Sequence, residues 1–166
     1  MDIVKLATEW AKAEVFSARF FILFALVFII ASVGFWQLGK TETARAYIIP
    51  TLVAGVLLMA VGLGIYFTNK SRVSSFAETY SANPTEFVQT EITRTEKSMN
   101  EYRTIVFKVI PFIIITAALL IVFVDKPMWR AISITTIAMM VVILLVDSNA
   151  NSRIEAYHKQ LEVVDT

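Results

Sequence analysis

Residues that could do chemistry are few in this chain, and they are scattered. The single histidine, His158, lies among the charged residues of the C-terminal segment, and we interpret it as an ordinary surface residue. The run Asp147-Ser148-Asn149-Ala150-Asn151 resembles the first positions of a calcium loop. However, Ser152 stands where such a loop needs glycine, and His158 stands where it needs a bidentate glutamate. We expect this run to end a helix and to accept hydrogen bonds from lipid headgroups.

The sequence carries none of the common motifs of nucleophilic, metal-dependent or phosphate-transfer chemistry. It has no His-Glu-x-x-His pattern, no P-loop and no Gly-x-Ser-x-Gly turn. It also has no cysteine, which excludes a disulfide, an iron–sulfur cluster and a thiolate zinc site. We therefore predict a protein that is not an enzyme and that holds no cofactor and no metal.

The composition is that of a membrane protein. The chain has 166 residues, of which 57% are hydrophobic, with a mean hydropathy of +0.66 and a net charge of +1. The apolar residues collect in four blocks, whereas a soluble domain disperses them with helix or strand periodicity. The near-zero net charge gives no reason to expect nucleic acid as a partner. We predict an integral membrane protein with four transmembrane helices.

The apolar blocks form two pairs, each joined by a short polar loop. We predict an all-α fold of two helical hairpins, one in a unit of residues 1–80 and the other in a unit of residues 81–166. Residues 152–164 should form an amphipathic helix after the last span. Residues 1–16 either lie in the membrane interface or pack on the connecting helix. The predicted spans cover residues 20–38, 46–68, 109–124 and 131–146.

The two halves share short sequence marks that could reflect an internal duplication. Arg45-Ala46 opens the second span and Arg130-Ala131 opens the fourth. Beyond these spans come Ser71-Arg72-Val73 and Ser152-Arg153-Ile154, respectively. Either the halves are a parallel repeat about an axis along the membrane normal, or a few residues match by chance. The sequence leaves both interpretations open.

The segment between the two hairpins is the one sizeable polar stretch. Asn83-Pro84-Thr85-Glu86 is typical of a helix start, with Asn as the N-cap and Pro in the first position. We predict a long cytoplasmic helix over residues 84–107 that continues into the third span, with a kink at Pro111. Apolar or neutral residues recur along this helix at alternating spacings of four and three, which defines a heptad seam. The seam residues are Val88, Ile92, Thr95, Met99, Tyr102 and Val106.

An amphipathic seam of this kind must be buried against another helix. That helix could belong to a second copy, to a partner, or to the terminal segments of the same chain. Charges beside the seam either form a solvated face or select a partner helix. They are Glu91, Arg94, Glu96, Lys97, Glu101 and Arg103.

Small, hydroxyl-bearing and polar residues share a face in the second and fourth predicted spans. Small residues let two membrane helices approach closely, but such a face could also line a narrow pore in an oligomer. The spans themselves carry no charged residue, which argues against a proton relay or an ion-coupled transporter. The residues of this face are Thr51, Gly55, Gly62, Ser133, Thr136, Met140 and, at the end of the fourth span, Asp147.

Lysine and arginine are unevenly distributed between the two sides of the predicted membrane. Eleven of the 15 lie in the terminal and connecting segments, and the hairpin loops hold the other four, Lys40, Arg45, Lys126 and Arg130. By the positive-inside rule, both termini lie in the cytoplasm. This plan suits a multi-pass protein of a bacterial inner (plasma) membrane.

Together these patterns predict a non-enzymatic, oligomeric four-helix membrane protein that assembles or binds a partner through its cytoplasmic helices. Its expected partners are the lipid bilayer, further copies of itself, and a cytoplasmic or membrane protein. The alternative is a small ion channel or pore-forming effector built from the same oligomer. A membrane-embedded enzyme acting on lipid is a third hypothesis.

Overall fold

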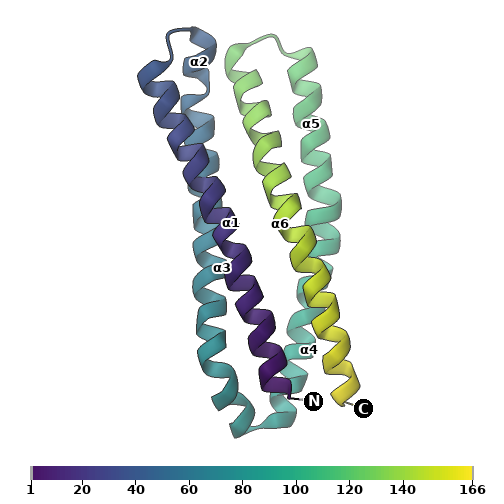
Figure 1. Ribbon diagram of the computed structural model, residues 1–166. Coiled ribbons are helices and arrows are strands. Elements are labelled where there is room, and N and C mark those ends of the chain that lie inside the picture. Colours follow the sequence, from purple (N-terminus) through teal and green to yellow (C-terminus); the bar gives the residue numbers. More distant parts are fainter. Residues whose placement is uncertain (1, 166) are drawn as a thin grey trace.

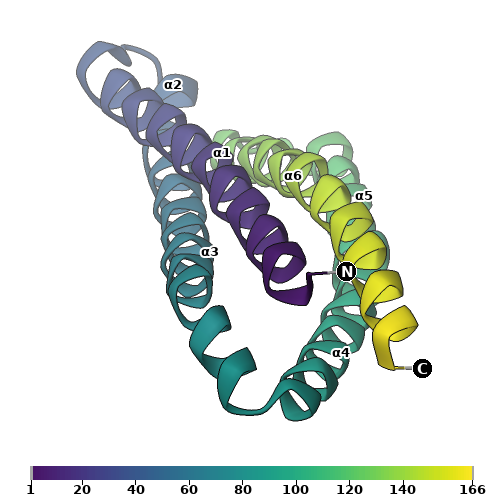
Figure 2. The same cartoon turned by 60° about the horizontal axis from the view of Figure 1, so that its bottom comes forward.

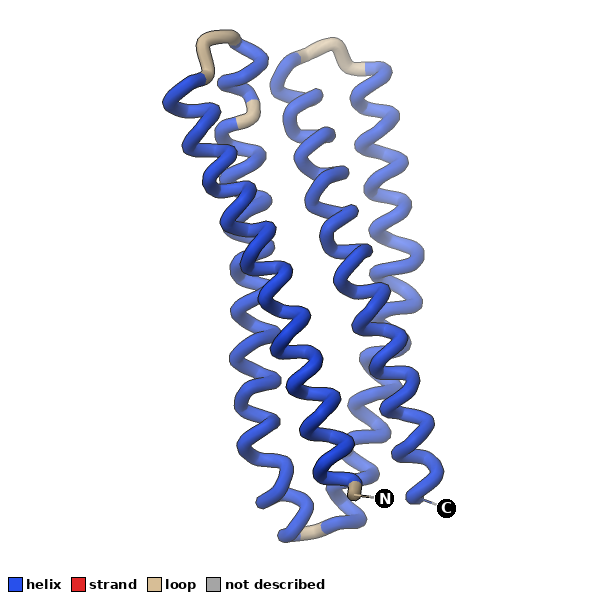
Figure 3. The backbone as a smooth tube through the Cα atoms, in the orientation of Figure 1, coloured by secondary structure: helices blue, strands red, loops and turns tan. Residues whose placement is uncertain are grey.

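The computed structural model describes residues 2–165, and all secondary structure in this range is helical (Figures 1 and 3). Four continuous stretches of helix are long and apolar enough to cross a membrane: Ile3–Leu38, Glu42–Ala82, Pro84–Phe123 and Pro127–Val164. The individual elements are α1 (Ile3–Leu38), α2 (Glu42–Ala46), α3 (Ile48–Ala82), α4 (Pro84–Glu101), the π-helical segment η1 (Tyr102–Val109), α5 (Ile110–Phe123) and α6 (Pro127–Asp165).

The long helices lie side by side, with their connections at opposite ends. Figure 1 shows the α1–α2 and α5–α6 loops at one end, and both termini with the α3–α4 turn at the other. Helix α1 packs along α3, and α5 packs along α6. Figure 2 shows α1 between α3 and α6. At the end that holds the termini, α4 follows α3 after a turn and packs against α6. Within the described residues, α5 contacts only α6 and η1, so it lies at the edge of the bundle.

The half of the molecule nearest the loops turns large apolar side chains outward. Leu38, Phe112 and Phe123 are each more than two-thirds exposed. The apolar core here is small and centres on Phe21, Ala25, Leu58 and Val142. Helices that are hydrophobic all round are typical of membrane spans.

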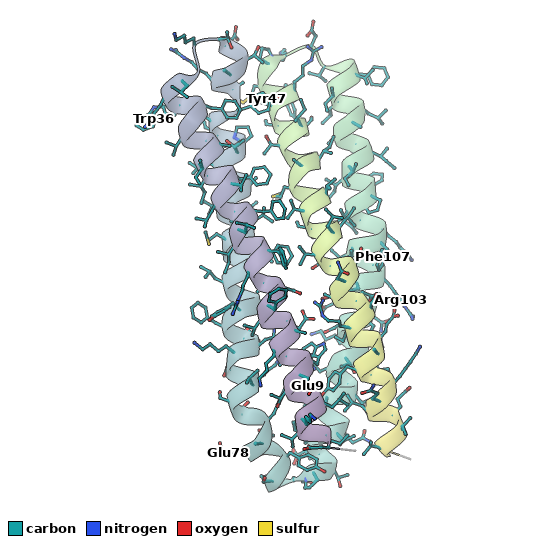
Figure 4. The ribbon with its side chains drawn as sticks, viewed as in Figure 1. Glu9, Trp36, Tyr47, Glu78, Arg103 and Phe107 are labelled. Atoms are coloured by element: carbon teal, nitrogen blue, oxygen red, sulfur yellow. The ribbon has the colours of Figure 1, made fainter. Side chains whose placement is uncertain are left out.

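The other half, which we call the stem, is formed by residues 3–18, 69–101 and 147–164. It buries an apolar cluster contributed by α1, α3, α4 and α6, in which Ile3, Phe76 and Leu161 are each at most 5% exposed. Polar side chains cover its outside, as the stick view in Figure 4 shows for Glu9 and Glu78. The stem is therefore packed like a water-soluble helical bundle, unlike the half above it.

The predicted start of the connecting helix is confirmed. The Asn83 side chain accepts a hydrogen bond from the Glu86 backbone N–H at 3.2 Å and donates to Glu86 Oε2 at 3.0 Å, and Pro84 opens α4. The helix then continues into α5 as predicted, but through η1. At the end of η1 the Ile110 N–H bonds to the Ile105 carbonyl, five residues back. Pro111 lacks an N–H and its ring clashes with the carbonyl four residues before it, and the widened segment lies directly before this proline.

The two terminal segments are not separate helices. Residues 3–16 are the first part of α1, and residues 152–164 are the last part of α6. The run from Asp147 to Asn151 therefore does not end a helix as predicted, because α6 continues through it. The apolar side of the N-terminal segment, including Ile3, Ala7 and Trp10, is buried in the stem cluster. Of the two interpretations of residues 1–16, packing on neighbouring helices is therefore the one that the geometry favours.

Candidate functional site: a buried ionic network in the stem

Glu14 of α1 and Arg153 of α6 form an ion pair inside the stem. Arg153 donates from Nε and Nη2 to Glu14 Oε1 at 3.1 and 2.9 Å, and Nη2 also donates to Ser17 Oγ at 2.8 Å. The Glu14 side chain is only 9% exposed. Burial raises the pKa of Glu14 above its ordinary value, and the nearby arginines, Arg153 above all, offset part of this rise. The pair fastens α1 to α6 directly below the predicted spans.

A second group of charged and aromatic side chains joins α4 to α6 and α1. Arg94 donates from Nε and Nη2 to the two carboxylate oxygens of Glu91 at 2.9 and 2.6 Å. Tyr157 donates its hydroxyl to Glu91 Oε2 at 2.9 Å. The Tyr157 ring stacks on Trp10 at 5.4 Å between centroids, and the Arg94 guanidinium lies over the Trp10 ring at 4.2 Å. Burial and the Glu91 charge raise the pKa of Tyr157, so its hydroxyl remains a donor.

Arg72 of α3 interacts with the charges of Arg94, Glu91 and Glu14, although its hydrogen bond is made within α3. Its Nη1 donates to Asn69 Oδ1 at 3.0 Å, and the Asn69 amide donates to the Ile65 carbonyl at 3.0 Å. Burial, together with the positive charge of Arg94, lowers the pKa of Arg72 below its ordinary value. We call Glu14, Arg72, Glu91, Arg94, Arg153, Trp10, Ser17, Asn69 and Tyr157 the ionic network.

Next to this network, a hydroxyl, an imidazole and a carboxylate lie near one another in succession. Thr95 Oγ1 lies 2.7 Å from His158 Nδ1, and His158 Nε2 lies 3.4 Å from Glu162 Oε1. The order resembles the nucleophile, base and carboxylate of a hydrolase triad. Thr95 is 0% exposed, however, and a substrate cannot reach its hydroxyl unless the helices separate. The arrangement ties α4 to α6 and gives no support for catalysis.

Two predictions from the sequence are wrong in this region. His158 is not an ordinary surface residue, because it is 8% exposed and bonded to Thr95. For Glu91 and Arg94 the interpretation as a solvated face is wrong, because both point into the stem. There Glu91 bonds to Tyr157 of α6 and Arg94 lies over Trp10 of α1, so the helices that they meet are the terminal ones of the same chain. The sequence of α1 does indicate that Glu14 is buried, because it belongs to a series with the same alternating spacing of four and three. The series is Ile3, Ala7, Trp10, Glu14 and Ser17. A charged residue at such a position indicates a buried ion pair.

The heptad seam of α4 and η1 faces the interior of the chain. Val88, Thr95 and Val106 are buried, at 6%, 0% and 4% exposure. Ile92, Met99 and Tyr102 are partly buried and pack against the stem cluster. The helices of the same chain therefore occupy the seam, and its use in an oligomer stays a prediction.

The small residues of α3 lie at its contact with α1. A Cβ atom at Gly55 would stand 2.7 Å from Ile29 Cγ1, and one at Gly62 would stand 2.9 Å from Phe21 Cβ. Thr51 is buried beside them and bonds to the Tyr47 carbonyl at 2.6 Å. This geometry is that of close helix packing.

The residues of α6 that were grouped with this face lie in other places. Ser133 and Thr136 line a groove of about 230 Å³ between α5 and α6. The buried Ser133 Oγ makes no hydrogen bond to any of residues 2–165. Asp147 lines a separate hollow of about 230 Å³ together with Glu101 and Tyr102. Met140 is half-buried. The structure does not bring all seven residues onto one surface.

The class that this geometry defines is an all-helical protein with four helices long and apolar enough to cross a membrane. Among residues 2–165, no three histidines or carboxylates are grouped so that they could hold a metal ion. Comparisons with family models, curated proteins and solved structures find no match to the chain. Its function is therefore argued from its own geometry.

Proposed function

We propose that this chain is a non-enzymatic protein of a bacterial inner membrane that assembles into an oligomer through its cytoplasmic helices. The four apolar helices support insertion. The termini and the α3–α4 turn lie at one end (Figure 1), and most of the lysines and arginines lie in the segments at that end, which supports a cytoplasmic stem.

The ionic network is the observation that carries the proposal. Arg153 of α6 is bonded to Glu14 of α1, and Tyr157 of α6 is bonded to Glu91 of α4. The Thr95 hydroxyl beside the network is closed to solvent. Buried ionic groups of this kind fix the arrangement of helices more than they add stability. A stem that is locked in this way presents its outer surface in one defined shape, which suits binding between proteins.

The outer face of α4 is the surface that we assign to assembly. Its side chains surround a shallow hollow of about 540 Å³ and carry both signs of charge, which include Glu96, Lys97 and Glu101. All three are exposed, and none of them is a residue of the seam. Alternating charges on a helix face are typical of contacts that choose a partner helix.

The test is the mass of the nanodisc-embedded protein, measured by light scattering. The wild type should form a discrete closed oligomer, and Glu96→Lys/Glu101→Lys should dissociate it through like-charge repulsion. Glu9→Lys/Glu78→Lys is the matched control, because it makes the same change in charge on α1 and α3 (Figure 4). A wild-type monomer, or equal dissociation in both variants, would refute assembly through this face.

One observation favours the alternative of a small channel. The buried Ser133 Oγ makes no hydrogen bond within the described part of the chain, and Ser133 shares the α5–α6 groove with Thr116 and Thr136. Hydroxyls gathered at a helix that is otherwise exposed could line a pore between copies. The channel predicts ion flux from protein-loaded liposomes that Thr136→Val reduces, whereas the assembly proposal predicts no flux from either protein.

A further inference from the structure

A groove of about 350 Å³ runs between α1 and α6 where the stem meets the predicted spans. Its upper part is lined by Phe20, Phe24 and Leu145, which belong to the first and fourth predicted spans. Leu145 is 62% exposed and Phe20 is 42% exposed, so the groove is open along its side. This part offers an apolar surface at the depth of the acyl chains.

The lower end of the same groove is polar. Ser17, Asn149 and Arg153 line it. Arg153 uses Nε and Nη2 for Glu14 and Ser17, which leaves Nη1 outside these bonds. Asn149 is exposed, and its amide donates to the Leu145 carbonyl at 2.9 Å, which leaves its oxygen and its second N–H available. Hydrogen-bond donors therefore lie at the headgroup level, directly below the apolar surface.

Arg19 does not line the groove itself, but it adds a positive charge next to Phe16, which does. Arg19 is exposed, and its guanidinium lies 5.9 Å from the ring centroid of Phe16. Within the described residues, Arg19 forms no ion pair, whereas Arg153 is already neutralised by Glu14. An excess cation thus lies beside the groove, and this charge complements a phosphate-bearing anion.

We propose that the α1–α6 groove is a binding site for an anionic phospholipid of the leaflet on the side of the stem. An acyl chain lies along Phe20, Phe24 and Leu145, and the phosphate is bound by Arg19, Asn149 and Nη1 of Arg153. The apolar wall of the groove corresponds to the acyl chain of such a lipid. The polar end and the nearby cation correspond to its negatively charged phosphate. The inference rests on the membrane insertion contained in the proposed function, but not on assembly.

The test is a native mass spectrometry titration of the detergent-solubilised full chain with phosphatidylglycerol and with phosphatidylcholine. The wild type should retain phosphatidylglycerol preferentially. Arg19→Gln should weaken its binding about fivefold, the contribution of one cation at an anionic membrane surface. Arg103→Gln is the matched control, since Arg103 is an exposed arginine on η1, which does not line the groove (Figure 4). This control should leave the affinity unchanged.

A second variant tests the apolar part without changing charge. Leu145→Trp fills the open side of the groove at an exposed position that tolerates a larger side chain, and it should also weaken phosphatidylglycerol binding. Equal retention of the two lipids, equal weakening by Arg19→Gln and Arg103→Gln, or full binding by Leu145→Trp would each overturn the site. Displacement of the lipid by inorganic phosphate alone would also overturn it, because the acyl chain would then contribute nothing. A protein that inserts and oligomerises but shows one of these results refutes the lipid site only.

Discussion

Gly62 offers the sharpest test of how α3 meets α1, because a methyl group there has no space. Its Cβ would lie 2.9 Å from both Ile22 Cγ1 and Phe21 Cβ, and 3.1 Å from the Ile22 backbone nitrogen. Phe21 is 2% exposed, so the base of its side chain cannot move aside without disturbing the core. At Gly64, two residues further along the same helix, a Cβ would meet nothing within 4 Å. Gly62→Ala must push the helices apart, whereas Gly64→Ala need not.

Two opposing contributions determine how much each substitution changes the free energy of unfolding. Replacing glycine by alanine in a helix interior gains about 0.8–1.0 kcal/mol of helix propensity at either site. Overpacking a tight contact costs about 1–3 kcal/mol, and this cost applies at Gly62 alone. Gly64→Ala should therefore stabilise the protein by up to about 1 kcal/mol. Gly62→Ala should range from neutral to about 2 kcal/mol less stable. The difference between the variants, about 1–3 kcal/mol, no longer contains the propensity term.

Reversible unfolding in mixed micelles of mild detergent and dodecyl sulfate, followed by far-ultraviolet circular dichroism, gives the free energy of unfolding of each variant. Gly55→Ala is a second test, since its Cβ would lie 3.0 Å from the Ala25 carbonyl oxygen. If Gly62→Ala and Gly64→Ala changed stability by the same amount, α1 would not pack on this face. The small residues of α3 would then be free to line a pore.

Three further predictions concern the stem. Tyr157→Phe removes the hydroxyl that donates to the buried Glu91 carboxylate, so it should lower the free energy of unfolding by about 1.5–3 kcal/mol in the same assay. Ile92→Asp/Met99→Asp places two unpaired carboxylates in the stem cluster, and hydrogen exchange should show loss of protection throughout α4. Glu14 has a folded-state pKa above its ordinary 4.5, so stability should fall as pH rises from about 4.5 through the raised value, and Glu14→Gln should remove this slope.

Each of these predictions has a control or an outcome that contradicts it. Tyr66→Phe should change stability by less than about 0.5 kcal/mol, because Tyr66 makes ring contacts but no hydroxyl bond comparable to that of Tyr157. A Tyr157→Phe protein as stable as the Tyr66→Phe protein would contradict the bond to Glu91. Full protection of α4 in the double aspartate variant would mean that the seam is not internal. An unchanged pH slope in Glu14→Gln would place the titration on another group.

The parts of the fold that depend on local sequence could be predicted. The four apolar blocks identify the long helices, because hydrophobicity over some twenty residues is sufficient to identify a span. The start of α4 follows from Asn83 and Pro84, since a cap acts within one turn. The continuous passage from α4 into α5 follows from the absence of a helix-breaking residue before Pro111.

The ionic network could not be predicted in the same way, because its pairs join residues far apart in the chain. Glu14 and Arg153 are separated by 139 positions, and Tyr157 and Glu91 by 66. Whether a charged residue is solvated or buried depends on which helices pack against the side of the helix that carries it. The local sequence around the residue does not specify those helices. His158 illustrates the point, since it is followed by the polar Lys159 and Gln160 in the sequence, while Thr95 contacts it from another helix.

The length of the π-helical segment η1 limits which deletions the long helix Pro84–Phe123 can accept. In a π turn the hydrogen bond spans one residue more than in an α turn, and one residue corresponds to about 100° of rotation around a helix. Segment η1 therefore sets which side of α5 meets α6, the side that carries the buried Ala117. Its length matters more than the identity of its exposed residues. Deletion of one residue from η1 would turn the whole of α5 relative to α6, the long helix against which it packs.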